Sequence, residues 1–473
     1  MQKKSQLLEF ERLPAAEVEK FTSALRQADD WNLFRINPFS FAGEHAISPD
    51  IAIDLFIHAA RIGLVDFNYN MICPRCGGVA RSHHELDAVE ATDFYCALCT
   101  ASTPTTLDDQ VEVSFAINPS VHKVSLNPLE SLESYNRYHF SANYVISPEL
   151  AALRKKLIRH LLVVALGKAK RIHLSKGRYR SFQLVSIETN TSITVHLERN
   201  DGSIGKTGSI AFGVDGFTQK ELSSTASQCE ITVHNSARTP VGMMLSTPDL
   251  EQILKVVADH PTQVKRFLTA KMLLNNQTFR ELFKVQHLST NLNLNIRSLT
   301  IMFTDLRGST EMYDRAGDVF AYSLVQEHFR ILTDCARKYQ GAIIKTMGDA
   351  IMATFSTPAD GMFAALDMMR EIAAMNDRVR RDGFEIGLKV GLHEGPALAV
   401  MRDERLDYFG QTVNIAARVQ GLASAGEIWV TQSVADAPAA RAAAEQAKLS
   451  AEQHRARLKG VGQETLVYKF SAA

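Results

Sequence analysis

No apolar run in this 473-residue sequence approaches the roughly 20 residues that an α-helix needs to cross a bilayer. The most apolar stretch, 161–167, is short and has charged residues on both sides, and the N-terminal residues MQKKSQLLEFERL contain no apolar signal core. The chain also has no net charge, because 52 basic side chains balance 52 acidic ones. The composition therefore predicts no membrane span, and it does not favour nucleic acid or an anionic membrane as the main partner.

Cysteine is scarce, and four of the six residues form two CxxC pairs. Cys73 and Cys76 are separated by 19 residues from Cys96 and Cys99, which is the spacing of zinc knuckles and ribbons. The alternatives are four free thiols or a redox pair. Four thiolates fill a tetrahedral site, so the pattern predicts one structural Zn²⁺ per chain and a reducing, cytoplasmic compartment. No basic cluster with aromatic residues accompanies the motif, so we do not expect it to bind nucleic acid.

The length is sufficient for two to four domains. Changes in pattern along the chain predict a helical and zinc-ribbon-like region, a small mostly β domain, a helical linker and a final mixed domain, over residues 1–147, 148–247, 248–297 and 298–473. The expected fold class is therefore α+β.

Local patterns predict the elements of the first three regions. Apolar spacing indicates a helix over 15–27, and Ser48 followed by proline indicates the capped start of a second one. Residues 148–167 are expected to be helical, whereas the short alternating runs over 171–246 predict a small antiparallel sandwich or barrel. The helical stripe over 248–284, broken at a proline, suits either a helix that joins chains or transmits a signal, or a linker packed within one chain.

The central stretch of the final domain is LTIMFTDLRGST followed by AIIKTMGDAIMATF. The first part predicts a strand over 299–304 that ends at Asp305, and the second predicts a hairpin over 341–356 with Asp349 at its tip. Each aspartate alone is compatible with an ordinary turn residue. Together, two carboxylates at the ends of buried strands suit a pair of hard divalent cations that bridge phosphates. The Gly-Ser-Thr turn at 308–310 offers backbone N–H groups to phosphate oxygens.

The rest of this domain alternates between helical and strand patterns, which predicts an α+β sandwich. The further elements are expected at 311–338, 358–381 and 412–422 for helices and at 386–394, 427–431 and 465–470 for strands.

These motifs resemble the class III nucleotidyl cyclase catalytic domain over roughly residues 299–470. The resemblance rests on FTDLRGST, IIKTMGDAIMATF, GLHEGPA, LDYFGQTVNIAARV and RLKGVG, in the order that the family has. It implies a ferredoxin-like catalytic fold. It also implies that Asp305 and Asp349, with the backbone carbonyl of Leu306, hold two Mg²⁺ or Mn²⁺ ions in each active site.

The same resemblance assigns the nucleotide-binding residues. Lys345 and Asp407 match the pair that recognises adenine, while Asn414 and Arg418 match the pair that orients the ribose and stabilises the transition state. Lys459 matches the lysine that contacts the triphosphate. A lysine donor and an aspartate acceptor suit adenine, whereas guanine presents the reverse polarity, so ATP is expected over GTP.

In this family two domains pair head to tail, and both active sites form across the interface. One cyclase domain with the complete residue set therefore implies a homodimer with two shared sites. The N-terminal 250 residues look like the uncharacterised region found ahead of some bacterial cyclases, which suggests a regulatory role with an unknown ligand or partner. The remaining alternatives are a guanylyl cyclase, a non-catalytic nucleotide-binding regulator and a zinc-ribbon protein that binds nucleic acid.

Overall fold

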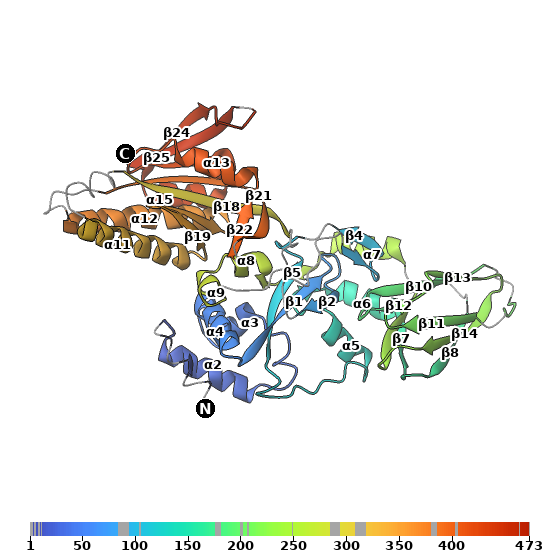
Figure 1. Ribbon diagram of the computed structural model, residues 1–473. Helices are drawn as coiled ribbons and strands as arrows, with labels where there is room; N and C mark the ends of the chain where they lie inside the picture. Colours follow the sequence, from blue (N-terminus) through green and yellow to red (C-terminus); the bar gives the residue numbers. More distant parts are fainter. Residues whose placement is uncertain are drawn as a thin grey trace.

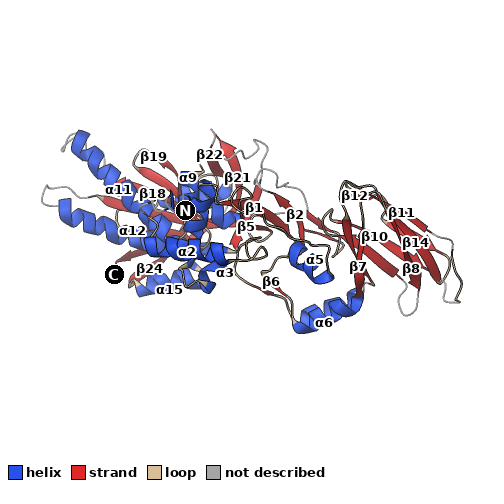
Figure 2. Ribbon diagram, turned by 90° about the horizontal axis from the view of Figure 1, so that it is seen from below, coloured by secondary structure: helices blue, strands red, loops and turns tan. Residues whose placement is uncertain are grey.

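The computed structural model describes the chain except for residues 1–2, 4–5, 8–9, 11, 84–93, 104–105, 176–180, 199–201, 206–207, 248, 284–293, 308–317, 380–385, 403–404, 463 and 473. The parts are arranged in a row, with the C-terminal domain at one end, a β-sandwich at the other and the N-terminal helices and sheet between them (Figure 1). The view from below has the same order (Figure 2). Over the described residues, every helix is too short or too polar to span a membrane.

The N-terminal part packs helices on a four-stranded sheet of order β17-β5-β1-β2. Its helices are α2 (Ala15–Gln27), α3 (Pro38–Glu44), α4 (Pro49–Arg61) and α5 (Leu132–His139). The strands of this sheet are β1 (Val65–Ile72), β2 (Val79–His83), β5 (Val111–Ile117) and β17 (Leu268–Thr269). Two small two-stranded sheets lie outside it. One pairs β3 (Phe94–Cys96) with β4 (Ala101–Thr103), and the other pairs β6 (Tyr144–Val145) with β16 (Gln263–Val264).

The helix predicted to begin after Ser48 is confirmed as α4. The Ser48 hydroxyl accepts a hydrogen bond from the backbone N of Ile51 at 3.4 Å, and a proline occupies the first turn. The apolar face of α4 packs on the sheet, where Phe56 stacks on Phe115 of β5 with ring centroids 4.8 Å apart. The helix predicted over 15–27 is confirmed as α2.

The middle part is a sandwich of two sheets, of order β13-β10-β9-β15-β7 and β12-β11-β14-β8. Its elements are α6 (Pro148–Leu157), β7 (Ile158–Val164), β8 (Ala169–Ser175), β9 (Ser181–Ser186), β10 (Thr191–Leu197), β11 (Gly208–Gly213), β12 (Gly216–Phe217), β13 (Glu221–Ser224), β14 (Gln228–Asn235) and β15 (Val241–Ser246). The predicted sandwich is confirmed. It is not wholly antiparallel, because β10 pairs with β13 and β11 with β14 in parallel.

Two helical predictions are wrong in part. Only the first half of 148–167 is helical, because Ile158–Val164 forms strand β7 and pairs with β15. The stripe over 248–284 divides into α7 (Leu250–Asp259), strands β16 and β17, α8 (Ala270–Leu274) and α9 (Gln277–Leu282). In both places, tertiary pairing with another strand overrides a local helical pattern.

The C-terminal domain has an eight-stranded sheet of order β19-β20-β18-β21-β23-β25-β24, with β22 paired to β21. Its strands are β18 (Leu294–Arg307), β19 (Ala342–Met347), β20 (Ala350–Phe355), β21 (Gly387–Arg402), β22 (Arg405–Phe409), β23 (Ile428–Thr431), β24 (Leu449–Ala456) and β25 (Thr465–Ala472). Its helices are α11 (Asp318–Lys338), α12 (Pro358–Val379), α13 (Gln411–Gln420), α14 (Gln432–Ala435) and α15 (Pro438–Gln446).

Alternation along β18 divides this domain into two cores. Met302 faces the core shared with α11 and α12, whereas Ile301 and Phe303 face the core shared with α13 and the N-terminal part. Helices therefore cover both faces of the sheet, and α13 lies on the side opposite α11 and α12 (Figure 1). The predicted α+β fold class and the predicted hairpin are confirmed, while β22, β24 and α15 were not predicted.

Candidate active site

The two aspartates expected to hold divalent cations lie at the same end of the neighbouring strands β18 and β20. Asp305 follows Thr304, which pairs with Ile351 of β20, and Asp349 lies in the turn immediately before β20. Gly348 makes this turn with φ of +66°, a conformation that glycine adopts without a steric penalty. Both carboxylates are partly exposed. Their position and oxygen chemistry fit Mg²⁺ or Mn²⁺.

Leu306 can contribute to such a site only through its backbone, because its side chain is buried in the core. The turn at 308–310, expected to bind phosphate, lies outside the described residues.

Lys389 of β21 is a neighbour of Asp305 that the sequence analysis missed. The two residues are directly opposite in the β18–β21 register, and Lys389 Nζ lies 2.9 Å from Asp305 Oδ2. A single charged residue in the otherwise apolar run GLKVGL was the signal that could have indicated it. Lys389 therefore supplies a fixed positive charge to one of the two carboxylates.

His328 of α11 lies close to Asp349 and is fully buried. Burial lowers the pKa of His328 to about 4, although the Asp349 carboxylate acts in the opposite direction. The ring is therefore neutral near pH 7 and packs beneath the turn that carries Asp349.

Lys345 and Asp407 come from different strands, β19 and β22, and meet in one chain. Lys345 Nζ donates to both carboxylate oxygens of Asp407, at 3.0 Å and 2.7 Å. The Asp407 side chain is 11% exposed and that of Lys345 is 37% exposed, so the pair is open on the lysine side. The structure thus brings together a cation and an anion that are 62 residues apart in the sequence.

The other three predicted residues lie apart from that pair. Asn414 and Arg418 are exposed and four residues apart, so they share one face of α13. Lys459 is exposed between β24 and β25. Within the described part of the chain, no side-chain hydrogen bond or ion pair links any of these three residues to Lys345 or Asp407.

The four cysteines of the two CxxC motifs form a compact cluster. All four Sγ atoms lie within 4.8 Å of one another. Cys73 and Cys99 are 3.9 Å apart through Sγ, and Cys76 and Cys96 are 3.8 Å apart. A tetrahedron with Zn–S bonds of about 2.3 Å has edges of about 3.8 Å, so the cluster has the dimensions of a zinc site.

The four thiols shift one another's pKa values through their hydrogen bonds. Hydrogen bonds from the other three cysteines lower the pKa of Cys73, and hydrogen bonding to Cys73 raises the pKa of Cys99. The group therefore favours at least one thiolate, which is the form that binds a metal. The loop between Cys96 and Cys99 also contacts the β-sandwich, since the Ala97 backbone N donates to Asn190 Oδ1 at 2.9 Å.

Two family models match this chain. The family described as "Family of unknown function (DUF5939)" matches residues 1–281, and "Adenylate and Guanylate cyclase catalytic domain" matches residues 294–470. The similar proteins include Adenylate cyclase 2 and Adenylate cyclase 1 of Rhizobium meliloti (strain 1021), at 32% identity over 132 residues and 30% over 138 residues. These matches cover 26% and 27% of this chain but only 36% and 21% of those proteins.

The similar solved structures include both types of cyclase. The adenylyl cyclase CyaB from P. aeruginosa has 21% identity and a TM-score of 0.33, covering 38% of this chain and 96% of that one. The guanylyl cyclase Cya2 has 19% identity and a TM-score of 0.34, covering 38% of this chain and 94% of that one. The chain therefore belongs to the DUF5939 family, and its residues 294–470 form a class III adenylyl/guanylyl cyclase catalytic domain.

Proposed function

We propose that this protein is an adenylyl cyclase that converts ATP to 3′,5′-cyclic AMP and pyrophosphate. The observation that carries the proposal is the contact between Lys345 and Asp407, with Nζ 2.7 Å from Oδ2. The ammonium is a donor and the carboxylate is an acceptor, and the two groups are held side by side.

This pair matches the edge of adenine. The ring nitrogen of adenine accepts a hydrogen bond from Lys345, and its exocyclic amine donates one to Asp407. Guanine presents a protonated ring nitrogen and a carbonyl oxygen at the same places. Its N–H donor would then face the Lys345 donor, and its carbonyl acceptor would face the Asp407 acceptor. Mismatched buried polar groups cost binding energy, so the pair favours ATP.

The cyclisation joins two ends of one nucleotide. The 3′-hydroxyl oxygen forms a bond to the α-phosphorus, the bond from that phosphorus to the pyrophosphate oxygen breaks, and the hydroxyl proton is released. Asp305 and Asp349 would hold two Mg²⁺ or Mn²⁺ ions, which when bound lower the pKa of the hydroxyl and neutralise the triphosphate.

The remaining residues act directly on the nucleotide. Asn414 orients the ribose, and the guanidinium of Arg418 stabilises the charge that develops on the phosphoryl oxygens. Lys459 binds the triphosphate and holds the leaving group in line.

We further propose a homodimer with two shared active sites. Asn414 and Arg418 are solvent-exposed, and within the described residues no side-chain hydrogen bond or ion pair joins them to the Lys345–Asp407 pair of their own chain. Large apolar side chains are exposed near the site, with Met347 beside the Asp349 turn at 42% and Phe409 at the end of β22 at 45%. A two-fold interface would cover these side chains and complete each active site at the same time.

The DUF5939 region is proposed to be regulatory, with a structural zinc ion at its cysteine cluster. Four thiolates leave no open coordination position, so the metal stabilises the fold and takes no part in catalysis.

A product assay tests the proposal. The full-length chain is incubated separately with ATP and GTP in the presence of Mn²⁺, and products are identified by mass spectrometry. Cyclic AMP with little cyclic GMP is expected. The double variant Lys345→Glu with Asp407→Cys reverses the hydrogen-bonding polarity of the pair, so it should weaken the use of ATP. Cyclic GMP as the main product would instead favour a guanylyl cyclase, and no product from either nucleotide would favour a non-catalytic regulator.

A further inference from the structure

Residues 270–282, comprising α8 and α9, lie between the N-terminal sheet and the C-terminal domain (Figure 1). We call these residues the bridging segment. It follows the short strand β17, which pairs with β5 of the N-terminal sheet, so it is continuous with the DUF5939 part of the chain.

One side of the bridging segment is anchored to the N-terminal part. Phe279 and Phe283 pack edge-on against Phe67 of β1, with ring centroids 5.7 Å and 5.3 Å away. Lys271 Nζ is 2.9 Å from Asp108 Oδ1, and both side chains are largely buried. The segment is therefore packed against the N-terminal sheet.

The other side of the segment holds the strand that carries Asp407. Arg280 donates from a guanidinium nitrogen to the carbonyl oxygen of Leu406 at 2.7 Å. Asn275 Oδ1 accepts a hydrogen bond from the Tyr408 hydroxyl at 3.2 Å. Both sequence neighbours of Asp407 are thus bonded to the same segment.

The charge of Arg280 also acts on this strand. Burial lowers the pKa of Arg280, whereas Asp407 and Tyr408 favour its charged form. The guanidinium remains a cation at any physiological pH, so Asp407 lies near two positive groups, Lys345 and Arg280.

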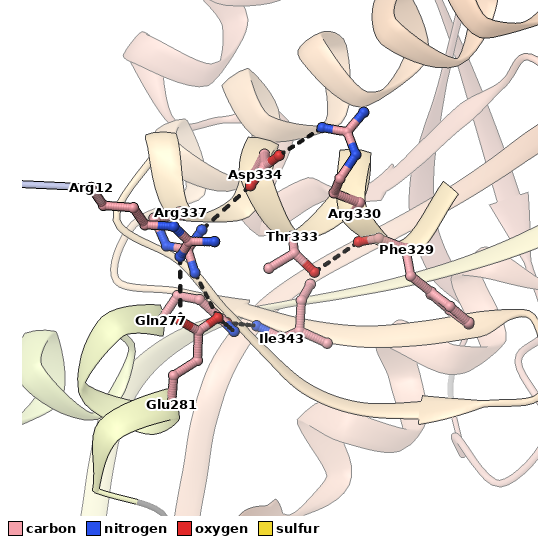
Figure 3. A network of polar contacts seen from close by, with 9 residues as sticks. All are labelled: Arg12, Gln277, Glu281, Phe329, Arg330, Thr333, Asp334, Arg337 and Ile343. Atoms are coloured by element: carbon pink, nitrogen blue, oxygen red, sulfur yellow. Dashed lines mark hydrogen bonds and ion pairs between the residues drawn. The ribbon is translucent and has the colours of Figure 1, made fainter. Parts of the chain in front are cut away.

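The strand that carries Lys345 is held by the same segment. Gln277 Oε1 accepts a hydrogen bond from the backbone N of Ile343 at 2.8 Å (Figure 3). Strand β19 is at the edge of the sheet, and its register with β20 shifts between Ile343 and Lys345. An edge strand with a bulge has unpaired backbone groups, and here a side chain from outside the domain satisfies one of them.

Asn275 adds a contact to the next strand, since its Oδ1 also accepts from the Thr354 hydroxyl of β20 at 2.7 Å. The end of the segment is tied to helix α11, where Glu281 lies 2.6 Å from Arg337 and 3.3 Å from Arg12 (Figure 3).

We propose that Asn275, Gln277 and Arg280 are positioning residues for the Lys345–Asp407 pair, so that the DUF5939 region sets the affinity of the cyclase for its nucleotide base. The inference rests on the proposed function, in which that pair recognises adenine. A hydrogen-bonding pair selects a base only when its donor and acceptor are held within a fraction of an ångström, and supporting contacts provide that constraint.

Positioning of the Lys345–Asp407 pair affects the binding of the nucleotide base and not the cyclisation step. The bridging contacts fall on Ile343, Leu406 and Tyr408. Within the described residues, the bridging segment makes no hydrogen bond or ion pair to Asp305, Asp349 or Arg418. Loss of the bridging contacts should therefore weaken nucleotide binding and base selection, and the chemical step of the bound nucleotide should be preserved.

The test compares Arg280→Met with Arg280→Lys in the full-length chain. Methionine keeps most of the side-chain length but cannot donate to Leu406, whereas lysine retains a charged donor. We expect Arg280→Met to raise the KM for ATP roughly five- to tenfold, with kcat changed by less than about twofold, and Arg280→Lys to recover part of the loss. The preference for ATP over GTP, taken as the ratio of kcat/KM values, should fall by a similar factor.

Arg330→Met is the matched control, because Arg330 is exposed and its 3.2 Å ion pair with Asp334 lies within α11. If Arg280→Met does not fold, as judged by its thermal unfolding, Gln277→Met decides the question by removing the acceptor for Ile343 at nearly constant volume. The affinity for an ATP analogue that lacks the 3′-hydroxyl and therefore cannot cyclise, measured by calorimetry, gives a readout that is independent of turnover.

Unchanged KM, analogue affinity and base preference in a folded variant would overturn the inference, as would an equal loss of kcat for both nucleotides. A wild-type enzyme that makes no cyclic AMP would instead overturn the proposed function, so the two failures are distinguishable.

Discussion

Lys389 Nζ lies 2.9 Å from Asp305 Oδ2, across the β18–β21 register. The cation is therefore in direct contact with a carboxylate that is proposed to bind a divalent metal. Both side chains are partly buried, at 25% and 34% exposed, so solvent screens the interaction only incompletely. An ammonium at this position opposes the arrival of a second cation at Asp305.

We therefore expect Lys389→Met to tighten metal binding. Removing the ammonium should lower the Mn²⁺ concentration needed for half-maximal activity by roughly fivefold. Calorimetric titration of Mn²⁺ in the presence of an ATP analogue that lacks the 3′-hydroxyl measures the same change without turnover. Lys338→Met is the control, because Lys338 is paired with Asp367 between α11 and α12. A weaker metal requirement in the control alone, or weaker binding in Lys389→Met, would contradict this interpretation.

The cysteine cluster predicts one zinc ion per chain, and its loss should destabilise the N-terminal part. Cys96→Ser with Cys99→Ser removes two of four ligands, and binding energy at a structural site is folding energy. We expect metal analysis to show one zinc in the wild type and none in the variant, with a thermal unfolding midpoint lower by several degrees.

Cys229→Ala provides the comparison for this experiment. Cys229 is buried in the β-sandwich and lies outside the cysteine cluster. The Cys229→Ala variant should therefore keep its zinc, even if the packing of the sandwich core is weakened. Protein purified without chelator and found free of zinc would refute the assignment.

How far the sequence could predict this site depends on the range of the contacts. The hairpin with Asp349 at its tip and the CxxC pairs are local patterns, and the structure confirms their geometry. Lys389 was missed because its role depends on a register in which it lies opposite Asp305, 84 residues earlier. Arg280 was missed for the same reason, since it contacts Leu406, which is 126 residues away.

The fold errors have a similar physical origin. The helix expected over 148–167 fails at residues 158–164, where Leu161, Leu162 and their neighbours form a short apolar run that suits helix or strand equally. The partner strand β15 decides the outcome, and its pairing with β7 is not visible from local periodicity. Strand β17 was likewise hidden within a helical stripe, because two residues paired with β5 leave little signal.

Buried histidines make stability depend on pH, and two of them, His58 and His139, lie in the N-terminal part. Burial lowers the pKa of His58 to about 4 and that of His139 to about 3, with smaller contributions of the same sign from Arg12 and Arg35 respectively. Glu281 acts in the opposite direction on His58, and the rings of Tyr135 and Tyr138 contact His139.

Unfolded histidine titrates near 6.5, so between that pH and about 4 the unfolded chain binds protons that the folded chain does not. Stability is therefore complete above pH 6.5 and falls as the pH decreases, by about 2 kcal/mol per histidine at pH 5. The unfolding midpoint should drop between pH 7 and pH 5, and it should drop less in His139→Phe, which keeps the ring contacts. An identical pH dependence in that variant would show that another group is responsible.

The shared active site makes a prediction about mixed dimers. In a homodimer of Asp349→Ala chains both sites lose a metal ligand, and in a homodimer of Arg418→Ala chains both sites lose the transition-state arginine. Each parent should be nearly inactive. In the mixed dimer, one site takes Asp349 from the second chain and Arg418 from the first, so that site is intact, while the other site carries both lesions.

Co-expression of the two variants with different tags, followed by tandem purification, isolates the mixed dimer. Its cyclic AMP production should reach up to half that of the wild type, because one of two sites is complete. If Asp349 and Arg418 instead served a site within one chain, every site in the mixture would keep one lesion. Activity of a verified mixed dimer that is no higher than that of its parents would therefore rule out the shared site. Arg418 would then have to act together with Asp349 of its own chain.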